Sequence, residues 1–306
     1  QWESMPALVT PRIKHACCAV GGSVAVIGGD TLVGDEREYT TTASVEALSS
    51  REGAVFVTLP PLSCGGIWGA AAIAVEAGDS GRGQVLLLGG GDPRSLPLST
   101  VQLLDLATGV CTPQPHLLRL RKYPAAAQMP DGRVVCAGGI GGGSSVEMWG
   151  PPDGDDQDGT LHQIIRNIWK GFLSPFKRCQ PEQGVQDAAC CWTELPTMST
   201  KRYSCGGCVM SDGRFAVLGG EASFSDEPMS SCEALTIGDS THWEPIPPMH
   251  DTRTHFACVA MAGCIIVAGG VDRTSAEVFD EVLGRWLRLP HDLPHVSRKG
   301  MSGALL

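Results

Sequence analysis

Short apolar runs separated by polar turns recur along the whole chain, and five of these runs end in a pair of glycines. The runs before the pairs, such as 24–27 and 215–218, are rich in Val, Ile, Leu and Ala. Apolar runs of about four to eight residues bounded by turn residues predict buried β-strands. The turns at 130–132 (Pro-Asp-Gly) and 211–213 (Ser-Asp-Gly) predict hairpins between such strands. The glycine pairs are Gly28-Gly29, Gly89-Gly90, Gly138-Gly139, Gly219-Gly220 and Gly269-Gly270.

Two further motifs recur in register with the glycine pairs. A hydroxyl residue, a small or apolar residue and Glu or Gln follow each pair and predict a third strand. These triplets are Ser44-Val45-Glu46, Thr100-Val101-Gln102, Ser145-Val146-Glu147, Ser231-Cys232-Glu233 and Ser275-Ala276-Glu277. A bulky residue (Cys in one copy) with Pro four positions later marks a fourth strand. These six motifs are Trp2/Pro6, Phe56/Pro60, Cys111/Pro115, Trp192/Pro196, Trp243/Pro247 and Trp286/Pro290.

Four short strands in each period of roughly 50 residues are the signature of a β-propeller blade. The combined motifs resemble the kelch family over nearly the whole chain, so we predict an all-β fold, a single kelch-type β-propeller domain spanning residues 1–306. Six motif copies predict six blades. The next glycine pair would fall past Leu306, so we expect an incomplete sixth blade, with its first strand at 303–306 and its fourth at 2–5, or a truncated chain. An exposed edge there could recruit a strand from a partner.

The third repeat carries an insertion, residues 150–191, between its third and fourth strands. An acidic loop precedes Thr160, which forms a helix-capping box with Gln163. The apolar residues that follow recur at helical spacing and predict one face of an amphipathic helix. They are Leu161, Ile164, Ile165, Ile168, Trp169 and Phe172. We expect this helix either to pack on the propeller's own surface or to bind a partner or a membrane surface.

An Arg follows the motif proline six positions later in four copies, and eight positions later in the last copy. These residues are Arg12, Arg121, Arg202, Arg253 and Arg298, and Gly66 takes the place in the second copy. We predict that they ring the channel mouth, near His15, Tyr123, Tyr203 and His255. Guanidinium groups bind carboxylates bidentately, and similar positions in kelch adaptors of cullin ubiquitin ligases bind acidic peptides. The alternative is that each Arg pairs with a repeat Glu (Glu46, Glu147, Glu233 or Glu277) and locks its blade.

Composition narrows the classes of function. The 306 residues carry 23 Lys and Arg against 33 Asp and Glu, and this net charge of −10 argues against nucleic-acid binding. No apolar run reaches the length of about 18 residues that predicts a transmembrane helix. No signal peptide is visible, although the chain starts at Gln1. Thirteen cysteines, an odd number found mostly in apolar runs, predict reduced thiols and a cytoplasmic location.

No catalytic residue, metal or cofactor is predicted. The Cys-Gly-Gly-Cys segment 205–208 has poor zinc spacing, and nucleophile-elbow, zincin and P-loop motifs are absent. Some kelch propellers are copper oxidases or sialic acid epimerases, but the copper ligand set cannot be assembled from the three tyrosines here. We therefore predict a non-catalytic protein-interaction module, either a substrate receptor of a ubiquitin ligase or a scaffold subunit. The alternatives are an enzyme acting on a small acidic metabolite or sugar at the channel mouth, and a structural subunit of a larger assembly.

Overall fold

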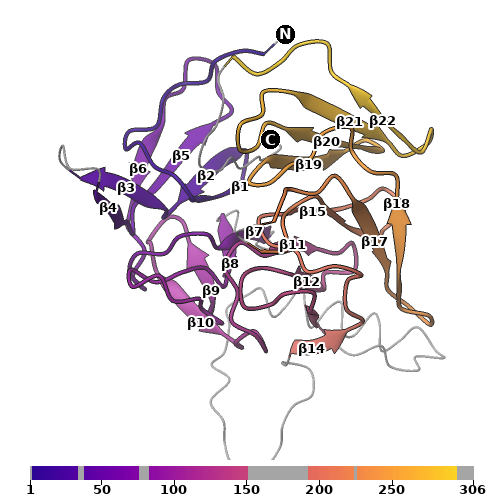
Figure 1. Cartoon of the computed structure of the whole chain (residues 1–306). Coiled ribbons are helices and arrows are strands. Elements are labelled where there is room, and N and C mark those ends of the chain that lie inside the picture. Colours follow the sequence, from indigo (N-terminus) through magenta and orange to yellow (C-terminus); the bar gives the residue numbers. More distant parts are fainter. Residues whose placement is uncertain (1, 34–37, 76–82, 151–191, 224–225, 295–306) are drawn as a thin grey trace, which may run out of the picture.

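The computed structural model describes residues 2–33, 38–75, 83–150, 192–223 and 226–294, and all regular elements of these residues are β-strands. Five antiparallel four-stranded sheets stand around a common centre as the blades of a propeller (Figure 1). A separate two-stranded hairpin lies between the second and third strands of the first blade. The described part of the chain contains no helix long and apolar enough to cross a membrane.

The four strands of each blade follow one another in the chain, except that the hairpin interrupts blade 1. Blade 1 contains β1 (Ala16–Val20), β2 (Ser23–Ile27), β5 (Val45–Ser49) and β6 (Val57–Leu59), with the hairpin β3 (Asp30–Val33) and β4 (Glu38–Thr41) beside it. Blade 2 contains β7 (Ala71–Val75), β8 (Gln84–Leu88), β9 (Val101–Asp105) and β10 (Cys111–Gln114). Blade 3 contains β11 (Ala125–Gln128), β12 (Val134–Ala137), β13 (Val146–Trp149) and β14 (Trp192–Leu195). Blade 4 contains β15 (Gly206–Val209), β16 (Phe215–Leu218), β17 (Cys232–Thr236) and β18 (His242–Ile246). Blade 5 contains β19 (Ala257–Met261), β20 (Cys264–Ala268), β21 (Ala276–Asp280) and β22 (Arg285–Arg288).

Hydrophobic clusters fill the spaces between consecutive blades. In β16, Phe215 and Val217 pack into the cluster shared with blade 3, whereas Ala216 and Leu218 pack into the cluster shared with blade 5. Neighbouring residues of a strand point to opposite faces, so a strand covered on both faces is apolar at every position. All four residues of β16 are buried accordingly. The apolar runs before the glycine pairs are therefore the second strands of the blades.

The glycine pairs allow adjacent blades to approach closely. Gly138, which follows β12 directly, has φ of +67°. A Cβ atom at this position would overlap the backbone oxygen of Arg202, in the loop that enters the next blade. The following residue, Gly139, donates its N–H to that same oxygen at 2.8 Å. Glycine is required here because both the left-handed backbone and the contact exclude a side chain.

The predicted count of six blades is wrong for the described residues, which form five. Residues 2–5, expected to be the fourth strand of a sixth blade, form no strand. A strand needs a neighbour that shares its ladder of hydrogen bonds, and no described strand lies beside them. Trp2 is nevertheless anchored to blade 5, because its Nε1 donates to the backbone oxygen of His291 at 2.8 Å. Residues 303–306 lie outside the described residues.

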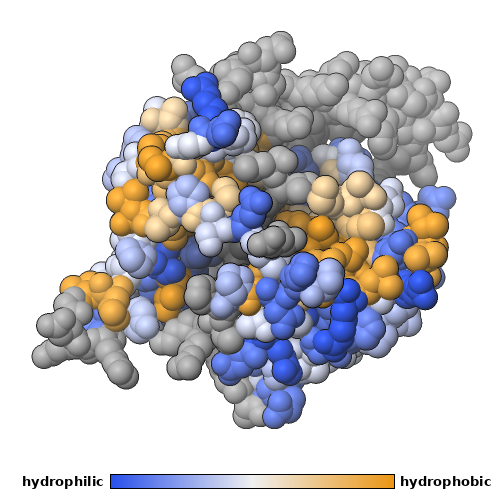
Figure 2. Space-filling model, turned by 90° about the horizontal axis from the view of Figure 1, so that it is seen from above, coloured by the Kyte–Doolittle hydropathy of each residue, from blue (hydrophilic) through white to orange (hydrophobic). Residues whose placement is uncertain are grey.

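The face of blade 5 that points away from blade 4 is only partly covered. Val259, Ile266 and Val278 are cross-strand neighbours on this face and are partly exposed. Ile265 and Val267 alternate with them on the other face and are completely buried against blade 4. Blades 1 and 5 stand next to each other in the upper part of Figure 1. The space-filling view from above shows that hydrophobic residues gather in separate patches on this side of the molecule (Figure 2).

The inserted segment falls within blade 3. Strand β13 ends at Trp149, β14 begins at Trp192, and the two strands pair with each other. The helical insertion predicted from the sequence lies outside the described residues, as does its whole apolar face. That face comprises Leu161, Ile164, Ile165, Ile168, Trp169 and Phe172. The described part of the chain contains no helix.

Candidate binding site at the channel mouth

Five equivalent residues, one from each blade, form a ring where the chain enters the innermost strands. Lys14, Gly69, Tyr123, Ser204 and His255 all have a left-handed backbone, with φ between 52° and 60°. Backbone hydrogen bonds link each residue to the next: the N–H groups of Gly69, Tyr123, Ser204 and His255 donate to the preceding member's oxygen at 2.8, 2.7, 3.2 and 3.0 Å. A non-glycine residue in this conformation costs about 1–3 kcal/mol. The ring of hydrogen bonds holds these four side chains at the channel mouth against that cost.

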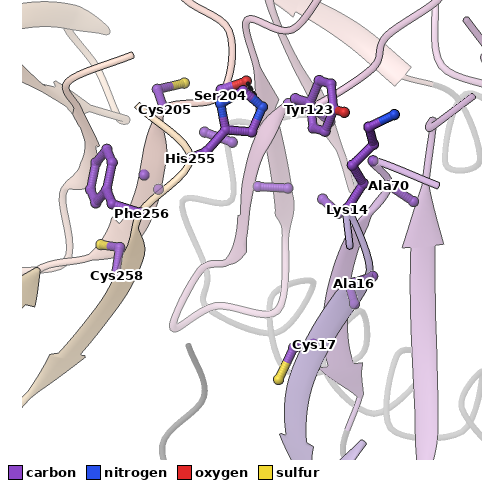
Figure 3. A pocket seen from close by; sticks show the side chains of 18 of the residues that line it. Lys14, Ala16, Cys17, Ala70, Tyr123, Ser204, Cys205, His255, Phe256 and Cys258 are labelled. Atoms are coloured by element: carbon purple, nitrogen blue, oxygen red, sulfur yellow. Dashed lines mark hydrogen bonds between the residues drawn. The ribbon is translucent and has the colours of Figure 1, made fainter. Parts of the chain in front are cut away.

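A cavity of about 210 Å³ opens below this ring along the propeller axis. The inner strands β1, β7, β11, β15 and β19 supply its wall, which consists largely of alanine, glycine and cysteine. Small side chains are expected at the point where the inner strands of all blades crowd together. Larger side chains occur only where these strands begin, so the cavity is lined by small side chains inside and is chemically varied at its mouth (Figure 3).

An aromatic cluster spans the mouth. The rings of Trp68 and Tyr123 lie 5.6 Å apart, and the rings of Tyr123 and His255 meet edge to face at 4.9 Å. Two ammonium groups contact the same indole: the Nζ atoms of Lys14 and Lys122 lie 4.5 and 4.8 Å from the centroid of Trp68. Figure 3 shows Tyr123 between His255 on one side and Lys14 on the other. The mouth therefore combines flat apolar surface with two cations that are attracted to one ring.

The two lysines are not equally neutralised. Lys14 forms an ion pair of 2.8 Å with Asp30, whose carboxylate also accepts a hydrogen bond from Thr41. The ammonium group of Lys122 instead donates to the backbone oxygen of Ser95 at 3.0 Å. Partial burial and the proximity of Lys14 lower the pKa of Lys122, and Asp92 opposes this shift only in part. Among the described residues, the mouth thus carries one cation that no carboxylate contacts directly, in a chain whose net charge is negative.

The two histidines of the channel are neutral at pH 7. Burial, with the nearby charge of Lys14, lowers the pKa of His255 to about 4. Its Nε2 lies 3.0 Å from the Ser204 hydroxyl and its Nδ1 lies 3.2 Å from the Thr254 hydroxyl. Burial and the charge of Arg12 lower the pKa of His15, also to about 4. Neutral imidazoles add ring surface and hydrogen-bonding capacity to the site but no positive charge.

The four described arginines of the predicted ring do not face the channel. Arg12, Arg121, Arg202 and Arg253 are buried, and each forms an ion pair within its own blade. Their partners are Glu46, Glu147, Glu233 and Glu277 respectively. Arg202 is representative: it donates to Glu233 at 3.1 Å, to the backbone oxygens of Gly219 and Ser231 at 2.9 Å each, and to the Ser231 hydroxyl at 2.9 Å.

This geometry corrects the expectation of ligand-binding arginines and corresponds to the alternative of blade-locking pairs. Guanidinium donors that bind a Glu and backbone oxygens inside the blade are not available to a ligand. Arg298 lies outside the described residues. In blade 2 an Ile stands where the other blades have the Arg. The backbone oxygen of Ile67 accepts a hydrogen bond from Gly29, just as the backbone oxygen of Arg202 accepts one from Gly139. The equivalent position is therefore Ile67 and not Gly66, which the sequence spacing had indicated. With no Arg to pair with, the repeat Glu of this blade is replaced by the neutral Gln102.

Comparisons with known proteins agree with this architecture. No family model matches the chain. Over 147 residues it is 44% identical to F-box/kelch-repeat protein At1g16250 from Arabidopsis thaliana, a match that covers 43% of this chain and 35% of that protein. The solved structure of YjhT matches with a TM-score of 0.66 over 98% of this chain and 89% of that chain. Together these matches support a kelch-repeat β-propeller. At 12% identity YjhT bears on the fold alone, and the propeller spans about a third of the length of its plant relative.

Only part of the kelch propeller's mouth was predicted from the sequence. The structure brings His15, Tyr123 and His255 together as lining residues. Tyr203 is buried outside the cavity lining, where its backbone forms a bridge with Glu221. Sequence reasoning missed Lys14, Trp68, Lys122 and Ser204. A signal for four mouth positions was present, since Lys14, Tyr123, Ser204 and His255 each stand two residues after a repeat Arg.

The described residues of the kelch propeller do not form a metal centre, because they contain no group of three or more His, Cys, Asp or Glu that could hold a metal ion. The channel thiol of Cys205 is protonated at neutral pH, because burial raises its pKa to about 11 with only a partial opposing effect of Arg202. Within the described part of the chain, the mouth presents aromatic surface, hydroxyl groups and one cation without a carboxylate partner.

Proposed function

We propose that this kelch propeller is a non-catalytic protein-interaction module whose channel mouth binds a partner peptide bearing a carboxylate beside an apolar side chain. The observation that supports this most strongly is the pair of lysine ammonium groups on the Trp68 ring, of which only Lys14 has a carboxylate partner among the described residues. An incoming carboxylate would pair with Lys122, and its neighbouring side chain would pack on Trp68 and Tyr123. Such charge-assisted hydrogen bonds are stronger than neutral ones.

A substrate receptor of a ubiquitin ligase is the role we favour for such a module, with a scaffold subunit as the alternative. Support comes from the relative whose name joins an F-box to kelch repeats. A cytoplasmic location goes with this proposal. The acidic partner motif, which the sequence attributed to the repeat arginines, is now assigned to Lys122 and its aromatic neighbours.

The test is affinity purification of partners with the whole chain and with a charge-reversal variant, Lys122→Glu. Lys122 is at the mouth, whereas Arg285 lies on the exposed outer strand β22, so Arg285→Glu is a control with the same change in charge. We expect Lys122→Glu to reduce partner recovery about tenfold, which corresponds to about 1.4 kcal/mol, and binding to weaken with added salt. Equal recovery with both variants would contradict the proposal.

Two other contact regions proposed from the sequence are separable in the same experiment. Deleting residues 153–178 tests the predicted insertion helix. The sequence also predicted that a partner strand could add to an incomplete sixth blade, which would pack on the partly exposed face of blade 5 formed by Val259, Ile266 and Val278. Ile266→Asp would abolish binding of a partner there and leave the mouth unchanged. Loss of the partner with either change, but not with Lys122→Glu, would move the interaction away from the channel mouth.

One contact favours the alternative of an enzyme, because the hydroxyl of Ser204 lies 3.0 Å from Nε2 of His255. A general base works best when its pKa is near the operating pH. The pKa of His255, lowered to about 4, makes this imidazole a poor proton acceptor at pH 7. We therefore rank binding above catalysis. A melting temperature that rises with a millimolar acidic sugar, in the parent and not in Ser204→Ala, would reverse this order.

A further inference from the structure

Three junctions between neighbouring blades are closed at the outer rim by the same hydrogen bond. The indole Nε1 of the motif Trp in one blade donates to the backbone oxygen of the motif Pro that follows the preceding blade. These bonds run from Trp192 to Pro115, from Trp243 to Pro196 and from Trp286 to Pro247, at 2.9, 2.8 and 2.8 Å. We call this contact the tryptophan clamp. It joins blades 2 and 3, blades 3 and 4, and blades 4 and 5.

The junction between blades 1 and 2 has no tryptophan clamp. Strand pairing places Cys111 at the Trp position of blade 2: Cys111 pairs with Leu104 as Trp243 pairs with Leu235. A second cysteine, Cys64, lies four residues after Pro60 in the loop that runs from blade 1 into blade 2. Each thiol donates to a backbone oxygen, Cys64 to Gly65 at 3.9 Å and Cys111 to Gly109 at 3.8 Å. The two thiols lie close enough for each to be the largest influence on the other's pKa. Cys64 is exposed and Cys111 is half-buried, so a dithiol at the surface occupies the junction.

The loop segment 63–64 wraps around the sulfur of Cys111. The N–H of Cys111 donates to the Ser63 hydroxyl at 2.8 Å, and the N–H of Ser63 donates to the backbone oxygen of Gly109 at 3.0 Å. The polar groups of Ser63 and Cys64, in both side chain and backbone, favour the thiolate form of Cys111. Cys64 contributes most, and together these groups outweigh the opposing effect of burial, so the pKa of Cys111 falls to about 6. A sulfur surrounded by donors reacts as a thiolate.

We propose that Cys64 and Cys111 form a reversible disulfide that closes the junction of blades 1 and 2 in place of the tryptophan clamp. With glutathione disulfide as oxidant, the Cys111 thiolate attacks one glutathione sulfur and the other glutathione leaves as a thiolate. Cys64 then loses its proton to solvent and attacks the Cys111 sulfur, and the second glutathione leaves. Two protein thiols are oxidised and one glutathione disulfide is reduced to two glutathione molecules.

The disulfide would connect the loop from blade 1 to the outermost strand of blade 2. Residues 64 and 111 bracket β7, β8 and β9, so the closed loop contains most of blade 2. Gly109 already packs closely against Pro60 and Pro61 at this junction, because a Cβ there would overlap the backbone oxygen of Pro61. Oxidation would therefore fasten two segments that lie in contact in the reduced protein, without rearranging the blades.

The experiment uses the whole chain, equilibrated in glutathione buffers of increasing oxidised fraction, then alkylated and digested for tandem mass spectrometry. We expect a linked peptide pair containing Cys64 and Cys111, which disappears in excess reduced glutathione. We also expect oxidation to raise the melting temperature by roughly 5 °C. Cys64→Ser and Cys111→Ser should each abolish both effects. Cys264→Ser, which removes a half-exposed thiol from β20, is the matched control and should keep both.

Two results would overturn the proposal. One is that oxidised glutathione links other cysteines, or none, while Cys64 and Cys111 remain alkylated. The other is that Cys64→Ser shows the same oxidant-dependent rise in melting temperature as the parent. Because Cys64 is exposed, its serine variant is expected to keep the reduced parent's melting temperature, and this measurement establishes that the variant is folded.

Discussion

Replacing both members of the buried pair Arg202–Glu233 should cost less than the two single replacements together. Blade 2 supplies the design, because it has an Ile and a Gln at the equivalent positions. We therefore compare Arg202→Ile, Glu233→Gln and the double variant. The side chains of Arg202 and Glu233 are 2% and 5% exposed, so either charge left without the other is largely removed from water.

The magnitude follows from what each variant leaves behind. Arg202→Ile leaves the Glu233 carboxylate with only the N–H and hydroxyl of Ser199, at 3.0 and 3.1 Å. Breaking a buried ion pair in this way costs about 3–5 kcal/mol. Glu233→Gln leaves a buried guanidinium with neutral acceptors only, and we expect a similar cost. The double variant removes both charges and leaves unpaired only neutral oxygens of Gly219 and Ser231, so its cost should fall below the sum of the singles by about 2 kcal/mol or more.

Urea unfolding of the four proteins, followed by tryptophan fluorescence, measures these free energies of unfolding. A double variant whose loss equals the sum of the single losses would refute the reasoning, because independent sites are additive. So would a loss of under about 1 kcal/mol for Arg202→Ile, since it would mean that the buried carboxylate needs no partner.

Two further perturbations test the channel and the blade junctions. The pKa of His255 is about 4 in the folded chain and 6.5 when unperturbed. Between pH 4 and pH 6.5 this imidazole is therefore protonated in the unfolded chain but not in the folded chain. Stability should therefore fall as the pH drops from 6.5 to 4, by about 3 kcal/mol for this residue. His255→Asn should remove this contribution to the pH dependence of the free energy of unfolding, measured by urea unfolding at a series of pH values. If the free energy of unfolding of the variant changes with pH as steeply as that of the parent, the prediction is wrong. Gly138→Ala should lose several kcal/mol, roughly 2–4, whereas Gly238→Ala, where a Cβ would meet open space, should unfold like the parent. Equal losses in thermal unfolding of these two variants would show that the close approach to Arg202 is unimportant.

The candidate site was only partly accessible from the sequence. Trp68, Tyr123 and the two lysines belong to different blades or to the loops between them. They come together only because the blades close around a common axis, so the local sequence does not reveal their contacts. Trp68 also stands outside the repeated Trp–Pro motif, so periodicity could not mark it. The arginines illustrate the opposite case. Their repetition was evident, but a repeated Arg beside a repeated Glu is compatible with ligand binding and with mutual neutralisation, and only burial distinguishes the two.

The sequence by itself determined the four-stranded blade as the repeating unit. Its four strands are consecutive, so apolar alternation, turn residues and glycine pairs record each one locally, and the five blades stand where the repeats place them. The number of blades, the pairing of Arg202 with Glu233 and the composition of the channel mouth depended on tertiary structure. These features arise from contacts between residues far apart in the chain, which exist only after the blades have packed around their common axis.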